Sequence, residues 1–140
     1  MLIGIVSPYS GPVEENEEYL RRCMALILAD GHTPVAGHAY LPHVLDDNDP
    51  AQREQGVRAG HELLAVCQEV HVFCDRGISA GMWQDIEYAQ EAKKPIVLSS
   101  VNGGEYRVTA NEIRALRYLA DTGINIMPPA WTVDRQEVVE

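Results

Sequence analysis

Short apolar runs alternate along this chain with longer segments of helical periodicity, and this alternation restricts the fold more than any other feature. The run Leu2–Val6 is almost continuously apolar, as expected of a strand buried on both faces of a parallel sheet. Further strands are predicted at Thr33–Ala36, Val70–Cys74, Pro95–Leu98 and Ile124–Met127. Because parallel strands need long crossover connections, the pattern predicts an α/β fold with a five-stranded parallel sheet and helices on both of its faces.

Four helices are predicted between these strands, and several of their ends carry terminal signals. Gly31 follows the first helix as a C-terminal signal. Asp49 is suited to cap the second helix, with Pro50 in its first turn and Gln52 as a capping-box partner. The predicted helices are Val13–Asp30, Pro50 to about Cys67, Met82–Lys93 and Thr109–Asp121.

The predicted strand order is 2-1-3-4-5, which is common for doubly wound sheets of this size. Its switch point lies between the first and third strands, so the loops after these strands should face one crevice. Residues 1–140 are expected to form a single domain. Loops are expected at Gly37–Asp49 and Ser99–Tyr106, and an irregular tail over 128–140.

Charge and composition exclude several classes of function. The net charge of −10 repels phosphate backbones and anionic lipids, so we expect no nucleic-acid polymer and no membrane surface as a partner. The apolar runs are far shorter than the ~20 residues of a membrane span, and Met1–Val6 has the pattern of a strand rather than of a signal peptide. A cytoplasmic protein is therefore expected, with Cys23, Cys67 and Cys74 as reduced core thiols.

The segment Ser79–Ala89 is the strongest candidate for chemistry, because it opens a helix directly after an apolar strand. Amide groups at such a helix start lack intrahelical partners and carry the positive end of the dipole. Asp85 lies in the first turn. Dipole complementarity alone also explains an acid there, and both interpretations stay open. Glu87 lies about 200° further round the helix, so only one of the two acids faces the crevice.

Two loops are further candidates. Ser7–Pro12 follows the first strand and is rich in small residues, which let backbone amides approach a phosphate, although a plain turn explains it equally well. It contains neither G-x-G-x-x-G nor a Walker lysine. The loop Gly37–Asp49 holds two histidines and three aspartates, but their spacing matches no recognised metal motif, and helix capping and ligand covering explain it more simply. The histidines elsewhere, His32, His61 and His71, are expected at the surface or at its boundary.

Five short segments occur in a characteristic order over about residues 2–100. They are Ser7–Gly11, Gly31–Ala36, Leu45–Pro50, Cys67–Phe73 and Ile78–Met82. Together they resemble the nucleoside 2-deoxyribosyltransferase-like superfamily, and within it small bacterial and phage proteins. The resemblance implies a flavodoxin-like three-layer sandwich, in agreement with the strand order above.

The resemblance also implies roles for individual residues. The family places a nucleophilic glutamate at the position of Asp85, so this chain carries an acid that is one methylene shorter. Ser79, six residues earlier, matches the serine with which related nucleotide hydrolases help to hold a 5′-phosphate. Asn125 lies in a segment similar to one that completes the site of a neighbouring subunit, which implies a homodimer or larger homo-oligomer. The predicted substrate-binding residues are Ser7, Tyr9, Ser10, Gly11, His38, Ser79, Gly81, Met82 and Asn125.

Three functions remain open from the sequence. The first is a glycosidase (hydrolase) or transferase that acts on the N-glycosidic bond of a nucleoside or nucleoside 5′-monophosphate, through Asp85 and without a metal or redox cofactor. In this case His38 or an acid of Asp46–Asp49 would protonate the leaving base. The second is a non-catalytic nucleotide-binding or sensing protein on the same fold, which the shorter acid favours. The third is a structural or partner-binding protein.

Overall fold

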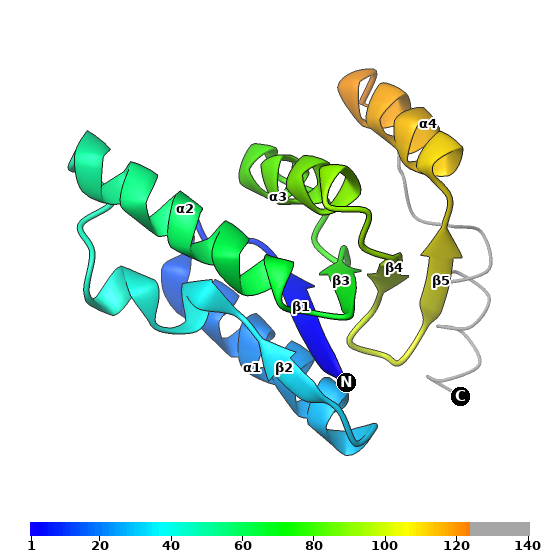
Figure 1. Cartoon of the computed structure of the whole chain (residues 1–140), viewed down its shortest axis with the longest axis horizontal. Coiled ribbons are helices and arrows are strands. Elements are labelled where there is room, and N and C mark those ends of the chain that lie inside the picture. The colour runs from blue at the N-terminus through cyan, green and yellow to red at the C-terminus, as the bar shows by residue number, and fades with distance from the viewer. Residues whose placement is uncertain (124–140) are drawn as a thin grey trace.

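A five-stranded sheet lies between two layers of helices in residues 1–123, the part of the chain that the structure, a computed structural model, describes (Figure 1). The strands are β1 (Leu2–Val6), β2 (Thr33–Val35), β3 (Glu69–Phe73), β4 (Ile96–Ser99) and β5 (Glu105–Val108). The helices are α1 (Val13–Ala29), α2 (Pro50–Ala65), α3 (Ala80–Glu91) and α4 (Ala110–Asp121), with the 3₁₀ turns η1 (Gly37–Ala39) and η2 (Leu41–His43). All four predicted helices and the first four predicted strands are present.

The strand order is β2-β1-β3-β4-β5, which confirms the predicted order. β1 pairs in parallel with β2 on one side and with β3 on the other, so that Gly4 lies between Val35 and Val70. β3 also pairs in parallel with β4. The chain therefore leaves β1 in one direction and returns past it to β3, and the carboxyl ends of these two strands meet at a topological switch point.

The prediction of an all-parallel sheet is wrong at the fifth strand. β5 is antiparallel to β4 and follows it through a short hairpin, in a segment predicted as a loop. The turn is closed by two hydrogen bonds of 2.9 Å, from Ser100 N–H to the Gly104 carbonyl and from Gly103 N–H to the Ser100 carbonyl. Gly103 adopts a φ of +95°, which favours glycine. An antiparallel neighbour needs no crossover helix, so this strand fits between β4 and α4. The predicted strand Ile124–Met127 lies outside the described residues.

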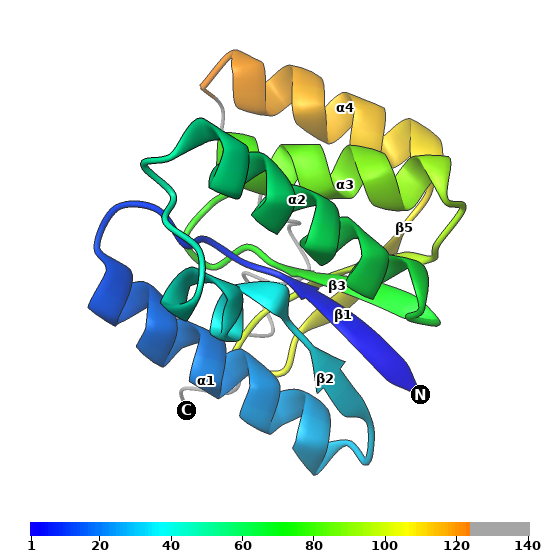
Figure 2. The same cartoon turned by 60° about the vertical axis from the view of Figure 1, so that its left-hand side comes forward.

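The helices divide between the two faces of the sheet. Helix α1 covers one face, and α2, α3 and α4 cover the other (Figure 2). On the α1 side the buried core contains Ile3, Ile5 and Phe73 from the sheet and Tyr19, Leu20, Cys23 and Ile27 from α1. On the opposite side it contains Val6, Val70, Val72, Ile96 and Leu98 from the sheet and Leu64, Met82, Trp83, Ile86, Ala89 and Ile113 from the helices. This arrangement confirms the three-layer α/β sandwich.

The three cysteines are buried and form no disulfide within residues 1–123, as expected of core thiols. Burial raises the pKa of Cys23 to about 12, which keeps this thiol protonated and unreactive at neutral pH. Among residues 1–123, no helix combines the length and the apolar composition needed to cross a bilayer.

Candidate active site

A cavity of about 420 Å³ lies at the carboxyl ends of β1, β2 and β3. Its volume falls within the range of about 300–1,000 Å³ that is common for small-molecule sites. Its walls come from the loops after these three strands and from one side each of α2 and α3. The polar residues that line it are Ser7, Tyr9, Ser10, His38, Asp47, Arg53, Ser79, Gln84 and Asp85.

The loop between β1 and α1 is held from behind by Asn16. The Nδ2 group of this buried side chain donates hydrogen bonds to the carbonyls of Tyr9 (2.9 Å) and Ser10 (3.1 Å). Its Oδ1 accepts from Nη1 of Arg76 at 3.2 Å. The side chains of Tyr9 and Ser10 are thereby directed to the cavity by a loop whose own polar groups are satisfied. Gly11 lies in the same loop, outside the cavity wall, and its φ of +99° requires glycine there.

Ser7 and His38 form an uncharged hydrogen-bonding unit in the cavity wall. Ser7 Oγ and His38 Nε2 are 2.7 Å apart, and the neutral tautomer of the imidazole decides which of the two donates. Burial lowers the pKa of His38 to about 4, because the surroundings disfavour the imidazolium. His38 is therefore neutral at pH 7.

The start of α3 presents backbone amides to the cavity. Ser79 caps the helix: its Oγ accepts from Met82 N–H at 3.3 Å, and its carbonyl accepts from Trp83 N–H at 3.0 Å. The Ser79 N–H in turn donates to Met82 Sδ at 3.5 Å. Helix geometry leaves the amides of the preceding positions, Ala80 and Gly81, without intrahelical acceptors. These amides and the Ser79 hydroxyl are suited to bind an anionic group.

Asp85 reaches the cavity from the second turn of α3 and not from its first turn as predicted, because the helix begins at Ala80. Its Oδ1 lies 3.1 Å from Nε2 of His61 on α2, and its side chain is 40% exposed. Burial raises the pKa of the Asp85 carboxyl, and the charge and hydrogen bond of His61 oppose this rise. Glu87 points elsewhere and pairs with Arg117 at 3.1 Å, so one acid faces the crevice, as the helical angle predicted.

The wall formed by α2 is the part of the site that the sequence analysis missed. A Cβ added to Gly60 would meet no heavy atom within 4 Å, so glycine leaves open space here. Arg53 is the only arginine or lysine that lines the cavity among the described residues. The residues of α2 in the wall recur at helical spacing: Arg53, Gly56, Val57, Gly60, Leu63 and Leu64. This spacing, with glycines four residues apart, was the available signal, but such a stripe is also typical of core packing.

The loop before α2 covers one side of the cavity. Asp49 caps α2 as predicted: its side chain accepts from Ala51 N–H at 3.1 Å. Gln52 does not complete a capping box; its Oε1 accepts from Asp46 N–H at 2.8 Å, which ties the loop to the helix. Asp47 is the one acid of this loop in the wall of the cavity. Within residues 1–123, no three His, Cys, Asp or Glu side chains gather as metal ligands would.

The structure brings most of the predicted site residues together in one wall. These are Ser7, Tyr9, Ser10, His38, Ser79, Gly81, Met82 and Asp85. Asn125 lies outside the described residues. The prediction of a surface or boundary position is wrong for His71, which is buried beside Glu69 and Ser99. His61 is partly buried, and its contact with Asp85 was not predicted.

Comparison with known protein families identifies the family to which the chain belongs. A family model described as "Domain of unknown function (DUF7768)" matches residues 1–99. The chain belongs to the DUF7768 family. The matched residues include β1 to β4 and the whole cavity wall, Asp85 among them. No curated protein matches the chain.

Solved structures resemble this DUF7768 protein in fold. The 2-deoxyribosyltransferase of Bacillus psychrosaccharolyticus is 16% identical, with a TM-score of 0.60 over 71% of this chain and 72% of that one. The CMP N-glycosidase of Clostridium botulinum is 14% identical, with a TM-score of 0.44 over 71% and 69%. The 2-deoxyribosyltransferase of Leishmania mexicana is 16% identical, with a TM-score of 0.47 over 71% and 63%. The first of these shows that the chain shares the fold of a 2-deoxyribosyltransferase, as the resemblance implied.

Proposed function

We propose that this DUF7768 protein cleaves or transfers the N-glycosidic bond of a nucleoside or nucleoside 5′-monophosphate, with Asp85 as nucleophile. The observation that carries the proposal is the Asp85 carboxylate, which lines a cavity of ligand size at the switch point of the sheet. The resemblance of the surrounding segments to nucleoside 2-deoxyribosyltransferases supports this class of reaction.

In the proposed reaction Asp85 attacks the anomeric carbon, and the C–N bond breaks as the base departs with its electron pair. Water then releases the sugar, or a second base accepts it. His38 is a poor proton donor to the departing base, because burial lowers its pKa to about 4 and leaves it neutral at pH 7. We therefore infer that the departing base takes its proton from solvent, which reaches the cavity beside the exposed Asp47 of the covering loop.

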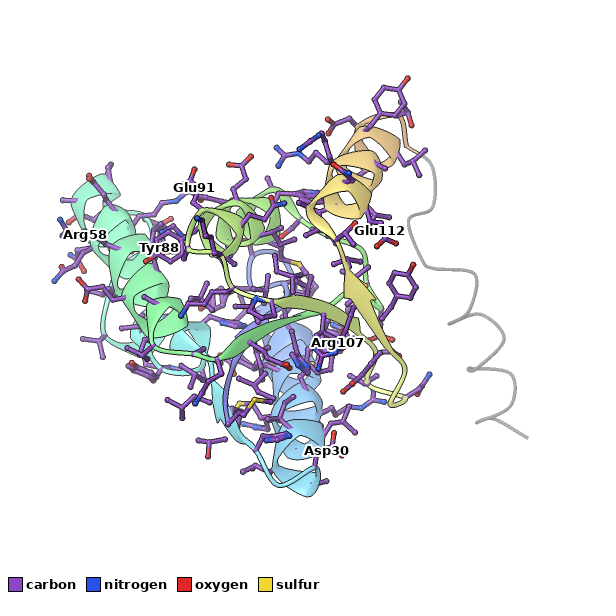
Figure 3. The ribbon with its side chains drawn as sticks, turned by 45° about the vertical axis from the view of Figure 1, so that its right-hand side comes forward. Asp30, Arg58, Tyr88, Glu91, Arg107 and Glu112 are labelled. Carbon is purple, nitrogen blue, oxygen red and sulfur yellow. The ribbon has the colours of Figure 1, made fainter. Side chains whose placement is uncertain are left out.

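Three groups favour a nucleoside monophosphate over a free nucleoside. The Ser79 hydroxyl can donate to a phosphate while it accepts from Met82, and the adjacent amides of α3 add uncharged donors. Arg53 supplies a positive charge to the same cavity. We expect Arg53→Ala to raise KM for monophosphates more than for nucleosides. Arg58→Ala is the matched control, because Arg58 lies on the outer side of α2 (Figure 3) and does not line the cavity.

The experiment that tests the proposal is base release from a panel of ribo- and deoxyribonucleosides and their monophosphates. The wild type is compared with Asp85→Ala and with Asp85→Asn, which keeps the shape of the side chain but is not a nucleophile. We expect release by the wild type and loss of release in both variants. Asp85→Ala with full turnover would show that another group is the nucleophile. Faster release by Asp85→Glu would show that the missing methylene limits the rate.

A nucleotide sensor is the second candidate, and the contact between Asp85 and His61 favours it, because it gives one carboxylate oxygen a partner without a substrate. A sensor predicts saturable nucleotide binding without base release. In thermal unfolding, a ligand at 100 times its Kd stabilises its binding partner by about 2.7 kcal/mol. No stabilisation by any nucleotide would instead favour a partner-binding protein. The homo-oligomer and the role of Asn125 stay predictions, and sedimentation of the full chain tests the first of them.

A further inference from the structure

A histidine from α2 holds the carboxylate that α3 brings to the cavity. His61 Nε2 lies 3.1 Å from Asp85 Oδ1. An ionised carboxylate only accepts hydrogen bonds, so Nε2 carries the proton and donates it. The described residues give Asp85 no second hydrogen-bond donor, which leaves Oδ2 available to the cavity. One oxygen of the carboxylate is thus fixed and the other is available to react.

The ring of His61 is itself held in place. It stacks on the ring of Tyr88 with centroids 4.3 Å apart and planes at 10°. Tyr88 follows Asp85 by three residues, so both project from the same side of α3, and Figure 3 shows Tyr88 between α2 and α3. The stacked pair fixes the plane of the imidazole, and with it the direction of the N–H group that meets Asp85.

His61 does not itself line the cavity, although Gly60 beside it and Asp85 do. Its side chain is 19% exposed. A group in this place reaches a bound ligand only through Asp85. Its effect on the carboxylate is also electrostatic: burial raises the pKa of Asp85, and the contact with His61 lowers it. The other charged residues of the cavity wall are Asp47 and Arg53.

We propose that His61 is a positioning residue, which anchors Asp85 Oδ1 so that Oδ2 faces the anomeric carbon of the substrate. This inference rests on the proposed function. When Oδ2 forms the bond to the anomeric carbon, the C–N bond breaks and its electron pair leaves with the base, which takes a proton from the protein or from solvent. Oδ1 becomes the carbonyl oxygen of the ester and keeps the hydrogen bond from His61. Water then bonds to the anomeric carbon as the bond from this carbon to Oδ2 breaks. The proton that the water loses returns to the protein or to solvent, and the Asp85 carboxylate is restored.

The test compares two substitutions of His61 with a control. His61→Gln keeps an N–H donor near the position of Nε2, whereas His61→Ala removes it. His32→Gln is the control, because His32 lies at the opposite end of the sheet, where its Nδ1 meets the amino terminus. Each protein is assayed for kcat and KM in base release, and the carboxyl of Asp85 is titrated by ¹³C NMR. Thermal unfolding verifies that each variant is folded.

We expect His61→Ala to lower kcat by about a hundredfold with little change in KM, the size of effect that a displacement near 1 Å produces. The NMR midpoint of Asp85 should move to higher pH. His61→Gln should recover much of kcat and shift the midpoint less, and His32→Gln should match the wild type in both.

Two results would overturn the inference. An Asp85 titration that is the same in His61→Ala and in the wild type would show that His61 does not hold the carboxylate. A shifted titration with wild-type kcat would show that the contact does not position the nucleophile. A wild type that releases no base from any substrate would overturn the proposed function instead, and the titration would still decide the contact.

Discussion

Acid should destabilise this protein through His38 before most carboxylates are protonated. Burial lowers the pKa of His38 to about 4, whereas a histidine in an unfolded chain has a pKa near 6.5. Between these values the unfolded chain binds the proton more readily, so the free energy of unfolding falls as the pH is lowered. The contribution of the neutral histidine is complete above pH 6.5, and it is lost progressively down to pH 4.

The size of the effect follows from the two pKa values. The full difference corresponds to about 3 kcal/mol, of which about 2 kcal/mol is lost between pH 7.5 and pH 5. Because domains of this kind are stable by only about 5–15 kcal/mol, such a loss is readily measured. The loss is also specific to His38, because replacing this histidine by a residue that does not titrate removes the loss.

Urea unfolding at pH 7.5 and pH 5 measures this loss. His38→Gln is the informative variant, because its amide lies near the position of Nε2 and keeps a partner for Ser7. The exposed His43 provides the control substitution, His43→Gln. We expect the wild type and the control to lose about 2 kcal/mol more than His38→Gln over this interval. An equal loss in all three proteins would refute a neutral His38 that is hydrogen-bonded to Ser7.

Three further substitutions test other parts of the structure. Tyr19→Phe removes a hydroxyl that donates to Asp75 Oδ2 at 2.6 Å and accepts from Asp75 N–H, and it should cost about 1–3 kcal/mol in urea unfolding. Gly60→Ala should raise the thermal midpoint, by up to about 1 kcal/mol in stability, yet weaken nucleotide binding, since its methyl group enters open space at the cavity wall. Burial would raise the pKa of Glu69, but His71 and Arg107 hold it below its usual range. Ionised Glu69 therefore stabilises the fold above about pH 4.3 and loses this effect in stronger acid. In Glu69→Gln the free energy of unfolding, measured in urea, should fall less steeply as the pH is lowered.

The inner strands of the fold were predictable because burial on both faces of a sheet requires nearly continuous apolar sequence. Leu2–Val6 and Val70–Cys74 are apolar runs that fit nothing but inner strands, and they form β1 and most of β3. Gly31 ends α1 with a φ of +84°, as its place after a helical pattern indicated. These signals are local, and each of them agrees with the topology.

The edge strand β5 was not predictable, for a physical reason. Only one of its neighbours is a strand, and three of its four residues are exposed, so their side chains are under little pressure to be apolar. Tyr106 and Arg107 therefore have the composition of a loop. The signal that was overlooked is the run Asn102–Gly104, which is suited to a hairpin turn.

The candidate site was predictable where it follows strands and unpredictable where helices meet. The loops after β1 and β3 lie at the switch point, which topology alone specifies. The contact between His61 and Asp85 depends on the distance and rotation of α2 against α3, and no local pattern encodes these. A histidine at a helix surface has the same sequence signature whether it faces water or a carboxylate.

Two of the loops around the cavity, those after β1 and β3, are joined behind its wall by one hydrogen-bond network. Tyr19 links α1 to Asp75 at the end of β3, and Asp75 accepts further hydrogen bonds from Ser100 Oγ (2.6 Å) and from Val101 N–H (3.0 Å) in the loop after β4. Arg76 lies over the ring of Tyr19 and donates to Asn16, the residue that holds the first loop. The network thus fixes two of the three loops at the cavity, those after β1 and β3, and ties them to the loop after β4 before any ligand arrives. A bound ligand therefore loses little free energy to the ordering of these two loops, and this part of the site favours tight binding of a small substrate.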